Sequence, residues 1–292
     1  MIIINMIGGL GNQMFQYALG RTLSLRLGVE LQLDISDFKG YLLHQGFELE
    51  RIFNIEAKIA SPSALDGLLG WQRRKLPRRV LVKSKFSFLR SKNFIVEPSF
   101  QYWPGIETVK SNSYLSGYWQ SERYFRDQVN AIKADFTFKL PLSAANQAIA
   151  EKMAGVNAVS IHLRRGDYVK NSETLAVHGV CTLAYYNNAI EKIAEKVAAP
   201  VFFVFSDDME WVKDNLDIPY SFHYIDHNKG LDSYNDMRLM AMCQHHIIAN
   251  SSFSWWGAWL GINPEKIVIA PRQWFANGAN TADLVPTDWV RL

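Results

Sequence analysis

Short apolar runs alternate with longer amphipathic segments along the second half of the chain. The runs are rich in β-branched and aromatic residues and predict strands at 158–163, 201–206, 221–225, 245–250 and 266–270. The segments between them have helical spacing and predict helices at 182–198, 208–216, 232–243 and 252–261. Strands that alternate with helices in this way indicate a parallel sheet with helices on both faces. In such sheets, ligands bind at the carboxyl ends of the strands.

The first half of the chain shows a less regular version of the same alternation. Its pattern predicts a strand over residues 1–7, a glycine turn, a helix from about Asn12 to Leu27 that Gly28 ends, and a second strand over 29–34. Weaker runs predict strands at 94–97 and 113–117 and helices at 121–133 and 143–154. We therefore predict an α/β protein of two domains, residues 1–150 and 151–292, with the ligand in the cleft between them.

Composition restricts the class of protein. With 292 residues, of which 48% are hydrophobic and 20% charged, the chain has the balance of a globular protein and is long enough for two domains. Nowhere do about 18 uncharged apolar residues run together, so we expect neither a membrane span nor a signal peptide. Cys181 and Cys243 are the only cysteines, which excludes a disulfide scaffold and favours the reducing cytoplasm.

Positive charge is concentrated in one segment. The chain has 31 basic and 28 acidic residues, yet nine basic residues and no acid lie between Arg73 and Lys92. Aromatic residues are interleaved with this charge, which would suit peripheral contact of residues 71–92 with the anionic inner face of a membrane. The interpretation that we favour is a solvated, basic helical insertion. No nucleic-acid-binding motif accompanies the charge, so we expect no nucleic-acid partner.

Two adjacent arginines, Arg164 and Arg165, follow the predicted strand 158–163 in the motif "HLRRGDY". A guanidinium group can donate two parallel hydrogen bonds to oxygens of a diphosphate, and each charge-assisted hydrogen bond contributes about 1.5–3 kcal/mol. Two of them at the ligand end of a strand could hold a nucleotide diphosphate without a metal ion. The alternative is that carboxylates such as Asp167 neutralise both arginines. We favour the diphosphate, because two arginines stand together beside a glycine.

A glycine-rich turn, "GGLGNQ" at 8–13, lies between the first predicted strand and helix. Gly9 and Gly11 match the start of a dinucleotide-binding fingerprint, but Met14 occupies the position of the third small residue, so an NAD site is not favoured. Glycines still let the backbone approach a ligand, and a helix N-terminus offers N–H groups to an anion. Asn12 and Gln13 add side-chain donors there. A simple tight turn with Asn12 as the helix N-cap is an equal alternative.

A serine-rich motif, "ANSSFSWWGAWLG" at 249–261, follows the predicted strand 245–250. Ser251 and Ser252 would supply hydroxyls and helix N–H groups to a phosphate. Trp255 and Trp259 are spaced as helical neighbours, which indicates core packing rather than a sugar contact. Asp236, early in the preceding predicted helix, could accept two hydrogen bonds from guanine. It could instead be an acidic residue that the helix dipole favours.

Several of these motifs resemble those of the bacterial α-1,2-fucosyltransferase family. The similar segments run in the family's order along almost the whole chain, although the resemblance weakens between about residues 40 and 100; they are "GGLGNQMFQYALG", "GYWQSERYF", "HLRRGDYV", "FSDDMEWVKDN", "DMRLMAMCQHHIIANSSFSWWGAWL" and "VIAPRQWF". The resemblance implies a GT-B-like pair of Rossmann-type domains. It also implies transfer of fucose from GDP-β-L-fucose, with inversion and without a metal or other cofactor, to the 2-hydroxyl of a galactose-terminated glycan.

The resemblance further implies roles for individual residues. Arg164 and Arg165 match a double arginine on the diphosphate, Asp236 matches an acid that reads guanine, and Asn12 matches an asparagine near the transferred sugar. His162, Ser252 and Phe253 match residues that flank the phosphates. The implied donor site as a whole comprises Gly9, Gly11, Asn12, Gln13, His162, Arg164, Arg165, Asp236, Ser251, Ser252 and Phe253.

We expect Arg164 to carry the main catalytic role, because a donor aimed at the charge of the departing diphosphate contributes about 10²–10³ in rate. Asn12 and His162 are further catalytic candidates. The general base is open. Asp167 is nearest the motif, but it could instead orient an arginine, and His162, Glu173 and Glu122 are weaker candidates.

A metal site is not expected. Asp207 and Asp208 are adjacent in "SDD", so within a strand they would point to opposite faces, and they could simply start a helix. Cys243, His245 and His246 do not have the spacing of a tetrahedral zinc site. Other functional classes that we considered are another nucleotide-sugar glycosyltransferase, an NAD-dependent oxidoreductase and a non-catalytic glycan-binding protein.

Overall fold

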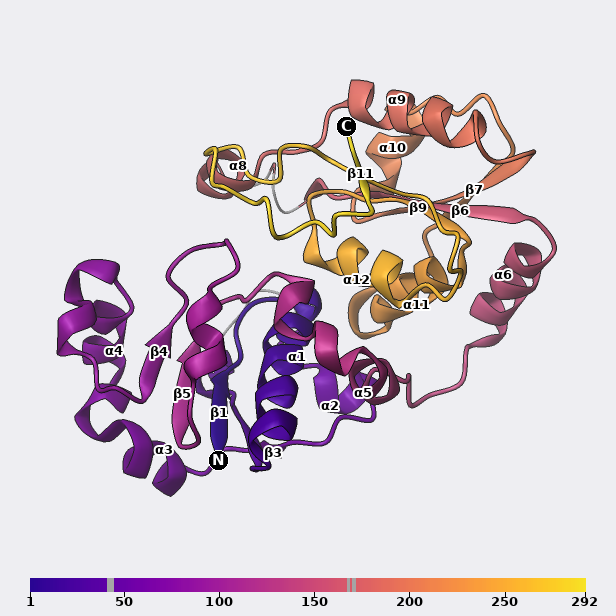
Figure 1. Ribbon diagram of the computed structural model, residues 1–292. Helices are drawn as coiled ribbons and strands as arrows, with labels where there is room; N and C mark the ends of the chain where they lie inside the picture. The colour runs from indigo at the N-terminus through magenta and orange to yellow at the C-terminus, as the bar shows by residue number, and fades with distance from the viewer. Residues whose placement is uncertain (41–44, 167–168, 170–171) are drawn as a thin grey trace. The chain divides into compact units, whose positions relative to one another are not determined.

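The computed structural model describes residues 1–292 except 41–44, 167–168 and 170–171. The chain forms two compact units (Figure 1). The first consists of Met1–Lys139 and Ala282–Leu284, and the second of Leu140–Thr281 and Val285–Leu292. The division falls at Lys139 rather than near residue 150, because α6 (Ala144–Ala154) packs on elements of the second unit.

A parallel sheet with the strand order β3-β2-β1-β5-β4 forms the centre of the first unit. Its strands are β1 (Ile2–Asn5), β2 (Leu31–Asp34), β3 (Lys58–Ile59), β4 (Phe94–Val96) and β5 (Ser113–Ser116). In the central strand, Ile2 lies opposite Leu31 on one side and Ser113 on the other. The described helices of this unit are α1 (Leu10–Leu27), α2 (Leu49–Ile52), α3 (Pro62–Leu69), α4 (Lys75–Leu81) and α5 (Val129–Asp135), with 3-10 turns at Ser36–Phe38, Gly70–Arg73, Ser84–Leu89, Pro104–Thr108, Glu122–Tyr124 and Arg126–Gln128.

Helices cover both faces of this sheet, because successive residues of a strand point to opposite sides. Ile3 belongs to a buried cluster with Leu65 of α3 and Leu81 of α4. Ile4, on the other face, lies against α1. Gly28 ends α1 in the left-handed conformation, as predicted. Helix α1 begins at Leu10, however, with Gly9 as N-cap, so the prediction of Asn12 as N-cap is wrong.

The second unit has a parallel sheet of order β11-β10-β9-β6-β7-β8. Its strands are β6 (Asn157–Leu163), β7 (Pro200–Ser206), β8 (Phe222–Ile225), β9 (His245–Ile247), β10 (Val268–Ala270) and β11 (Val290–Arg291). If these six strands are numbered 1 to 6 in chain order, the sheet read from the β8 edge to the β11 edge has the order 3-2-1-4-5-6 of the Rossmann fold. The described helices are α6, α8 (Ser172–His178), α9 (Leu183–Ala194), α10 (Met209–Asn215), α11 (Tyr234–Met242) and α12 (Ser252–Leu260), with a 3-10 turn at Gly230–Asp232.

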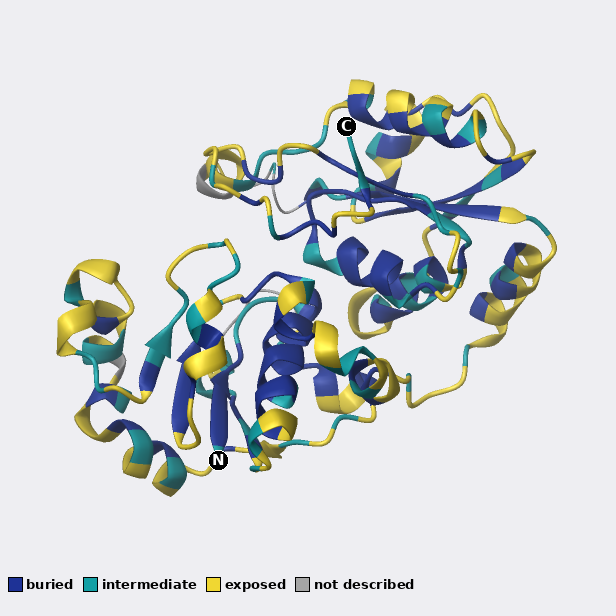
Figure 2. Cartoon of the chain, viewed as in Figure 1, coloured by how far each residue is buried: buried dark blue, intermediate teal, exposed yellow. Residues whose placement is uncertain are grey.

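Apolar side chains hold these layers together. Helices α9 and α10 lie on one face of the second sheet and α11 and α12 on the other (Figure 1). Tyr186 and Ile190 of α9 are buried in a cluster with Val204 of β7. Figure 2 shows the central strands β1, β5, β6 and β7 as mostly buried, whereas the segment of α3 and α4 is largely exposed. The predicted α/β class, with parallel sheets, is confirmed.

One predicted helix of the first unit differs from the structure, whereas the predicted basic insertion agrees with it. The predicted helix 121–133 is wrong in its first half, where 3-10 turns at Glu122–Tyr124 and Arg126–Gln128 precede α5. Buried Phe125 interrupts the helical path there, with a φ of −136°. The basic segment does form a helical insertion, which consists of α4 and the 3-10 turns beside it.

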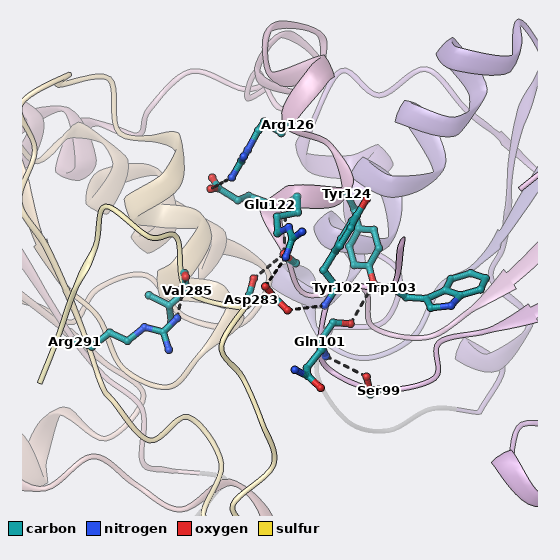
Figure 3. A network of polar contacts seen from close by, with 12 residues as sticks. Ser99, Gln101, Tyr102, Trp103, Glu122, Tyr124, Arg126, Asp283, Val285 and Arg291 are labelled. Atoms are coloured by element: carbon teal, nitrogen blue, oxygen red, sulfur yellow. Dashed lines mark hydrogen bonds and ion pairs between the residues drawn. The ribbon is translucent and has the colours of Figure 1, made fainter. Parts of the chain in front are cut away.

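The short segment Ala282–Leu284 returns the chain to the first unit. The carboxylate of Asp283 accepts a hydrogen bond from the backbone N–H of Tyr102 at 3.1 Å and pairs with Arg123 at 2.7 Å (Figure 3). Its carbonyl accepts a hydrogen bond from the hydroxyl of Ser121. One residue near the C-terminus therefore bonds to two loops of the first unit.

Candidate active site

The candidate site of the second unit lies at the carboxyl edge of its sheet. The strand order reverses between β6 and β9, and in open parallel sheets a crevice for ligands forms outside this point. Strand β6 ends at Leu163, directly before Arg164 and Arg165. Strand β9 ends at Ile247, shortly before Ser251 and Ser252. The topology thus brings the arginine motif and the serine motif to neighbouring strand ends.

Two carboxylates at the end of β7 hold the arginine turn. Asp207 accepts hydrogen bonds from the backbone N–H groups of Arg165 and Gly166, at 2.9 and 3.1 Å. It also pairs with the Arg164 guanidinium at 3.3 Å. Burial raises the pKa of Asp207, but Arg164 and the two N–H groups lower it more, so the net pKa lies below the usual value of an aspartate.

Asp208 pairs with the second arginine. Its Oδ2 lies 3.5 Å from Nε of Arg165, whose guanidinium stacks over the ring of Trp211 at 4.0 Å. The interpretation that carboxylates neutralise both arginines is therefore correct for the described residues. The partners are Asp207 and Asp208. The sequence placed Asp207 at the carboxyl edge and suggested a helix start for the pair, but did not predict these ion pairs. Asp167, the partner and base that we had considered, lies outside the described residues.

His162 is buried below this turn. Burial lowers the pKa of His162, the Asp207 charge opposes this shift and the Arg164 charge adds to it; the net pKa is about 4, so the ring is neutral at pH 7. Its Nδ1 has no hydrogen-bond partner in the described structure, and the ring lies 5.8 Å from that of Phe253. A base with so low a pKa is poorly matched to proton abstraction at pH 7.

The serine motif forms the start of α12. Ser251 is the N-cap, and its hydroxyl accepts a hydrogen bond from the N–H of Phe253. Ser252 and Phe253 in the first turn are only half-buried, which leaves their side chains accessible to a ligand. Trp255 and Trp259 are buried and stack on each other, so the prediction of core packing is confirmed.

Asp236 lies in the first turn of α11 and is half-buried. Burial raises its pKa to about 7, although a hydrogen bond from Asn228 and the charge of Lys229 lower it. Asn228 donates to Asp236 at 2.8 Å and is itself held by Asn146. The carboxylate is thus positioned by an amide and has no ion pair in the described part of the chain. These features suit an acceptor of hydrogen bonds from a neutral heterocycle.

The glycine turn of the first unit uses its residues differently from our prediction. Gly8, not Gly9 or Gly11, has the left-handed φ of 76°, and a β-carbon there would lie 2.6 Å from Nδ2 of Asn12. Gln13 is buried and donates to the carbonyls of Gly8 and Gly46, so its amide holds loops together and does not face a ligand as predicted.

Asn12 remains close to a second polar group. Its Oδ1 accepts a hydrogen bond from Nε2 of Gln120 at 2.6 Å, which links the glycine turn to the segment after β5. Asn12 belongs to the first unit, whereas Arg164, Asp236 and Ser252 belong to the second.

Comparison with known proteins identifies the family. The sequence model of the family described as glycosyl transferase family 11 matches residues 90–292. The chain belongs to glycosyl transferase family 11. An alpha-1,2-colitosyltransferase of Escherichia coli is 36% identical over 297 residues, which cover 100% of this chain and 98% of the relative. The O-antigen biosynthesis glycosyltransferase WbnK of Escherichia coli is 34% identical over 305 residues, which cover 98% of each chain.

Solved structures support the fold. The NodZ alpha-1,6-fucosyltransferase, in a crystal soaked with GDP-fucose, matches with a TM-score of 0.56 at 16% identity and covers 92% of this chain and 94% of that chain. The predicted GT-B-like class is confirmed at the level of the fold. Family membership also makes the protein a fucosyltransferase-like glycosyltransferase, and sets aside the oxidoreductase and the non-catalytic glycan-binding protein.

Two further residues of this family 11 enzyme, Asn250 and Asp207, lie at the carboxyl edge of the second sheet, where the strand pattern had placed them. Asn250, which is buried, donates to the carbonyls of His178 and Trp274 and so joins two loops near the serine motif. Asp207 follows β7, the neighbour of β6, and therefore lies at the same sheet edge as Arg164. The described residues contain no group of three or more histidine, cysteine, aspartate or glutamate side chains suited to a metal ion. None of the described helices combines the length and the apolar character needed to cross a membrane.

Proposed function

We propose that this family 11 glycosyltransferase is a galactoside α-1,2-fucosyltransferase. It transfers L-fucose from GDP-β-L-fucose to the 2-hydroxyl of a terminal galactose, with inversion and without a metal ion. The observation that carries the proposal is the pair Arg164 and Arg165 at the switch point of a Rossmann sheet. The named specificities of the relatives support it, since one forms an alpha-1,2 linkage and a protein of the same fold was soaked with GDP-fucose.

The arginine turn supplies what the reaction needs electrostatically. As the bond from the sugar to GDP breaks, negative charge grows on the β-phosphate. Arg164 is only a quarter exposed and is aligned in advance by Asp207, so little reorganisation is needed when this charge develops. The ion pairs of Arg164 with Asp207 and of Arg165 with Asp208 are long, at 3.3 and 3.5 Å, so a bidentate bond to a diphosphate can replace them.

The other residues of the second unit bind the nucleotide. Ser252 and the N–H groups at the start of α12 are placed to contact phosphate oxygens, where the helix dipole also favours an anion. Asp236 accepts the ring N–H and amino hydrogens of guanine. In the first unit, Asn12 contacts the transferred sugar, and Gln120 sets the orientation of its amide. These roles follow the family resemblance and the accessibility of each side chain.

Colitose is the second candidate for the transferred sugar, because a relative of 36% identity is an alpha-1,2-colitosyltransferase. Colitose is fucose without the 3-hydroxyl group, so the same diphosphate and guanine contacts would serve both donors. Turnover of GDP-fucose and GDP-colitose with galactose-terminated acceptors, measured as kcat/KM for each donor, decides between them. A preference for GDP-colitose would replace the fucose assignment and leave the nucleotide site in place.

Replacing Arg164 tests the mechanism. We expect Arg164→Ala to lower kcat at least 100-fold, because the growing charge on the leaving diphosphate loses its main donor. The far-UV spectrum should be unchanged, and a chelator should leave wild-type turnover intact. Lys196→Ala, at an exposed position next to the amino edge of β7, is the control and should retain normal activity. Near-normal turnover of Arg164→Ala would overturn the mechanism.

We also propose a cytoplasmic enzyme that contacts the membrane through residues 71–92. In this segment Trp71, Leu76 and Phe88 are 57%, 76% and 78% exposed, next to exposed basic residues such as Arg79. This combination suits an anionic lipid surface. We expect the protein to sediment with vesicles of phosphatidylglycerol but not of phosphatidylcholine, and 0.5 M salt to release it. Equal sedimentation of a Leu76→Ser, Phe88→Ser variant would contradict the contact.

A further inference from the structure

Four polar side chains of the second unit form a network of hydrogen bonds that ends at Asp236. They come from three segments: Asn146 from α6, His227 and Asn228 from the loop after β8, and Asp236 from the first turn of α11. Asn146 and Asn228 are only 1% and 7% exposed. Buried amides need partners for their polar atoms, so the partners fix which way each amide points.

The two amides bond to each other in both directions. Nδ2 of Asn146 donates to Oδ1 of Asn228 at 2.9 Å, and Nδ2 of Asn228 donates to Oδ1 of Asn146 at 3.0 Å. The ring Nε2 of His227 lies 2.7 Å from the same oxygen of Asn146 and donates to it, since an amide oxygen only accepts. The backbone of Asn146 is fixed in turn, because its N–H bonds to the hydroxyl of Ser143, the N-cap of α6.

The second hydrogen of the Asn228 amide group points at Asp236. Nδ2 of Asn228 donates to Oδ1 of Asp236 at 2.8 Å. Rotating this amide by half a turn would place its oxygen against the carboxylate and its NH₂ group against that of Asn146. Only the donating orientation therefore satisfies both neighbours. A carboxylate oxygen has two acceptor positions, so Asp236 can still accept hydrogen bonds from a ligand.

Packing alone does not explain this network. Apolar side chains of the same shape would fill the buried space and leave no donor or acceptor to satisfy. What the amides add is direction, because a fully satisfied polar network has one arrangement. Asn235 gives a useful contrast. It is also buried, one residue before Asp236, but its Nδ2 bonds to the carbonyl of Asp232 directly before the same helix.

A carboxylate with a fixed orientation can distinguish purine bases. Guanine presents its ring N–H and its 2-amino group side by side, and the two oxygens of one carboxylate accept both when they lie in the plane of the base. Hypoxanthine, the base of inosine diphosphate (IDP), keeps the ring N–H but lacks the amino group. If the carboxylate rotates freely, the second hydrogen bond to guanine must also offset the cost of ordering the side chain, and the difference between the bases shrinks.

We propose that Asn228, held by Asn146, orients Asp236 and thereby sets the selectivity of the donor site for guanine nucleotides. The inference rests on the proposed function, in which Asp236 accepts the hydrogens of guanine. Asn228 and Asn146 are positioning residues, because both are buried and act through Asp236.

The charge of Asp236 agrees with this role. Burial raises the pKa of Asp236, whereas the hydrogen bond from Asn228 and the charge of Lys229 lower it, and the charge of Asp226 opposes them. Loss of the Asn228 amide would therefore raise the pKa further and favour the protonated acid. A protonated carboxyl group carries a donor on one oxygen, so it cannot accept both hydrogens of guanine.

The test measures the Kd values of GDP and IDP by calorimetry for wild type and Asn228→Leu. In the wild type, GDP should bind at least about tenfold more tightly than IDP, which is the contribution of one hydrogen bond to a charged group. In Asn228→Leu this ratio should fall to less than about threefold, through weaker binding of GDP. Asn235→Leu is the matched control. It removes a buried amide beside Asp236 and should keep the wild-type ratio, even if its Tm is lower.

A double-mutant cycle separates positioning from a general loosening of the unit. A residue that acts only through Asp236 has no further effect once Asp236 is replaced, so Asn228→Leu should leave the ratio of Asp236→Asn unchanged. The variant Asn146→Leu, Asn228→Leu guards against unfolding, because it replaces both amides by apolar side chains. It should show the same reduced ratio as Asn228→Leu.

A wild-type ratio in Asn228→Leu or in the variant with both amides replaced would overturn the inference. So would an equal fall in the ratio when Asp236 is already Asn. Fucose transfer by the wild type would in either case leave the proposed function standing. Equal binding of GDP and IDP by the wild type would remove the guanine role of Asp236 and the inference with it, whereas absence of fucose transfer would overturn the proposed function independently of these ratios.

Discussion

At the scale of single residues, the arginine turn shows how one carboxylate can serve two purposes. Asp207 bonds to two backbone N–H groups and also to the Arg164 guanidinium. The backbone bonds fix the turn, whereas the ion pair is long, at 3.3 Å, and a ligand can displace it. Two guanidiniums held next to each other without acids would repel, and the carboxylates remove this cost before the ligand arrives. A neutralised but aligned pair is therefore ready for a diphosphate.

The affinity for GDP should depend on the proton of Asp236. In the folded protein the pKa of Asp236 is raised to about 7 by burial, so the folded state holds this proton at pH values where the unfolded chain has lost it. The carboxylate therefore costs stability as the pH rises from about 4 to 7. Guanine needs the ionised form, so lowering the pH below about 7 should weaken GDP binding by up to tenfold per unit.

Calorimetric titration of GDP between pH 5.5 and 8.5 measures this dependence. The second phosphate ionisation, with a pKa of about 6, also contributes. Asp236→Asn serves as the control because it keeps the phosphate contribution and removes that of the carboxylate. An identical pH dependence in wild type and Asp236→Asn would contradict the assignment of Asp236 to guanine.

Single residues were predictable from the sequence where the strand pattern fixed their place. Arg164 and Ser252 follow apolar strands, so their position at the carboxyl edge could be read from the pattern. Asp207 was placed at the same edge, but its ion pair with Arg164 was not predicted, because the pair depends on which strands are neighbours. Gln13 illustrates the opposite error. Its position beside the glycine turn suggested a ligand contact, but its amide bonds to Gly46, far along the chain.

At the scale of elements, helix α4 is attached to the first sheet through Arg78. The side chain of Arg78 is 11% exposed and pairs with Asp34 at 3.0 Å, with Asp37, and with the hydroxyl of Tyr114 at 3.0 Å. Asp34 is the last residue of β2, so the contact joins the basic segment to the sheet. A buried arginine among carboxylates anchors this segment, while the neighbouring Arg79 is exposed.

Removing Arg78 should loosen this attachment. We expect Arg78→Ala to lower the free energy of unfolding by about 3–5 kcal/mol, because the carboxylate of Asp34 is left buried without its partner. Urea denaturation measures the change. Arg79→Ala is the matched control, since Arg79 is exposed, and it should change the stability by less than about 0.5 kcal/mol. Equal effects of the two substitutions would show that the buried pair is not an anchor.

Elements were predictable where periodicity was strong. The central strands β6 and β7 are buried on both faces and gave continuous apolar runs, so their ranges were found to within a residue. Strand β3 has two residues, both exposed, and leaves no apolar signal. The segment 121–133 has helical spacing, but Tyr124 packs on Trp119 and draws the chain out of a regular helix. Tertiary packing decided that segment.

At the scale of the whole molecule, the chain crosses between the units at Lys139, at Thr281 and after Leu284. The second and third crossings place Asp283 in the first unit and β11 in the second. The C-terminal residues therefore contribute to the stability of both units, although they are few.

Loss of the Asp283 carboxylate should consequently affect one unit selectively. Asp283→Ala removes the acceptor for the N–H of Tyr102 and the partner of Arg123, which is 45% exposed, so we expect a loss of about 1 kcal/mol. Hydrogen exchange should become faster in peptides covering 99–103 and 121–125 and stay unchanged in β6. GDP at 100 times its Kd should slow exchange in the second unit by the equivalent of about 2.7 kcal/mol where exchange requires global opening, in the variant as in the wild type. Faster exchange in β6 of the variant, or loss of the GDP effect, would show instead that Asp283 stabilises the second unit.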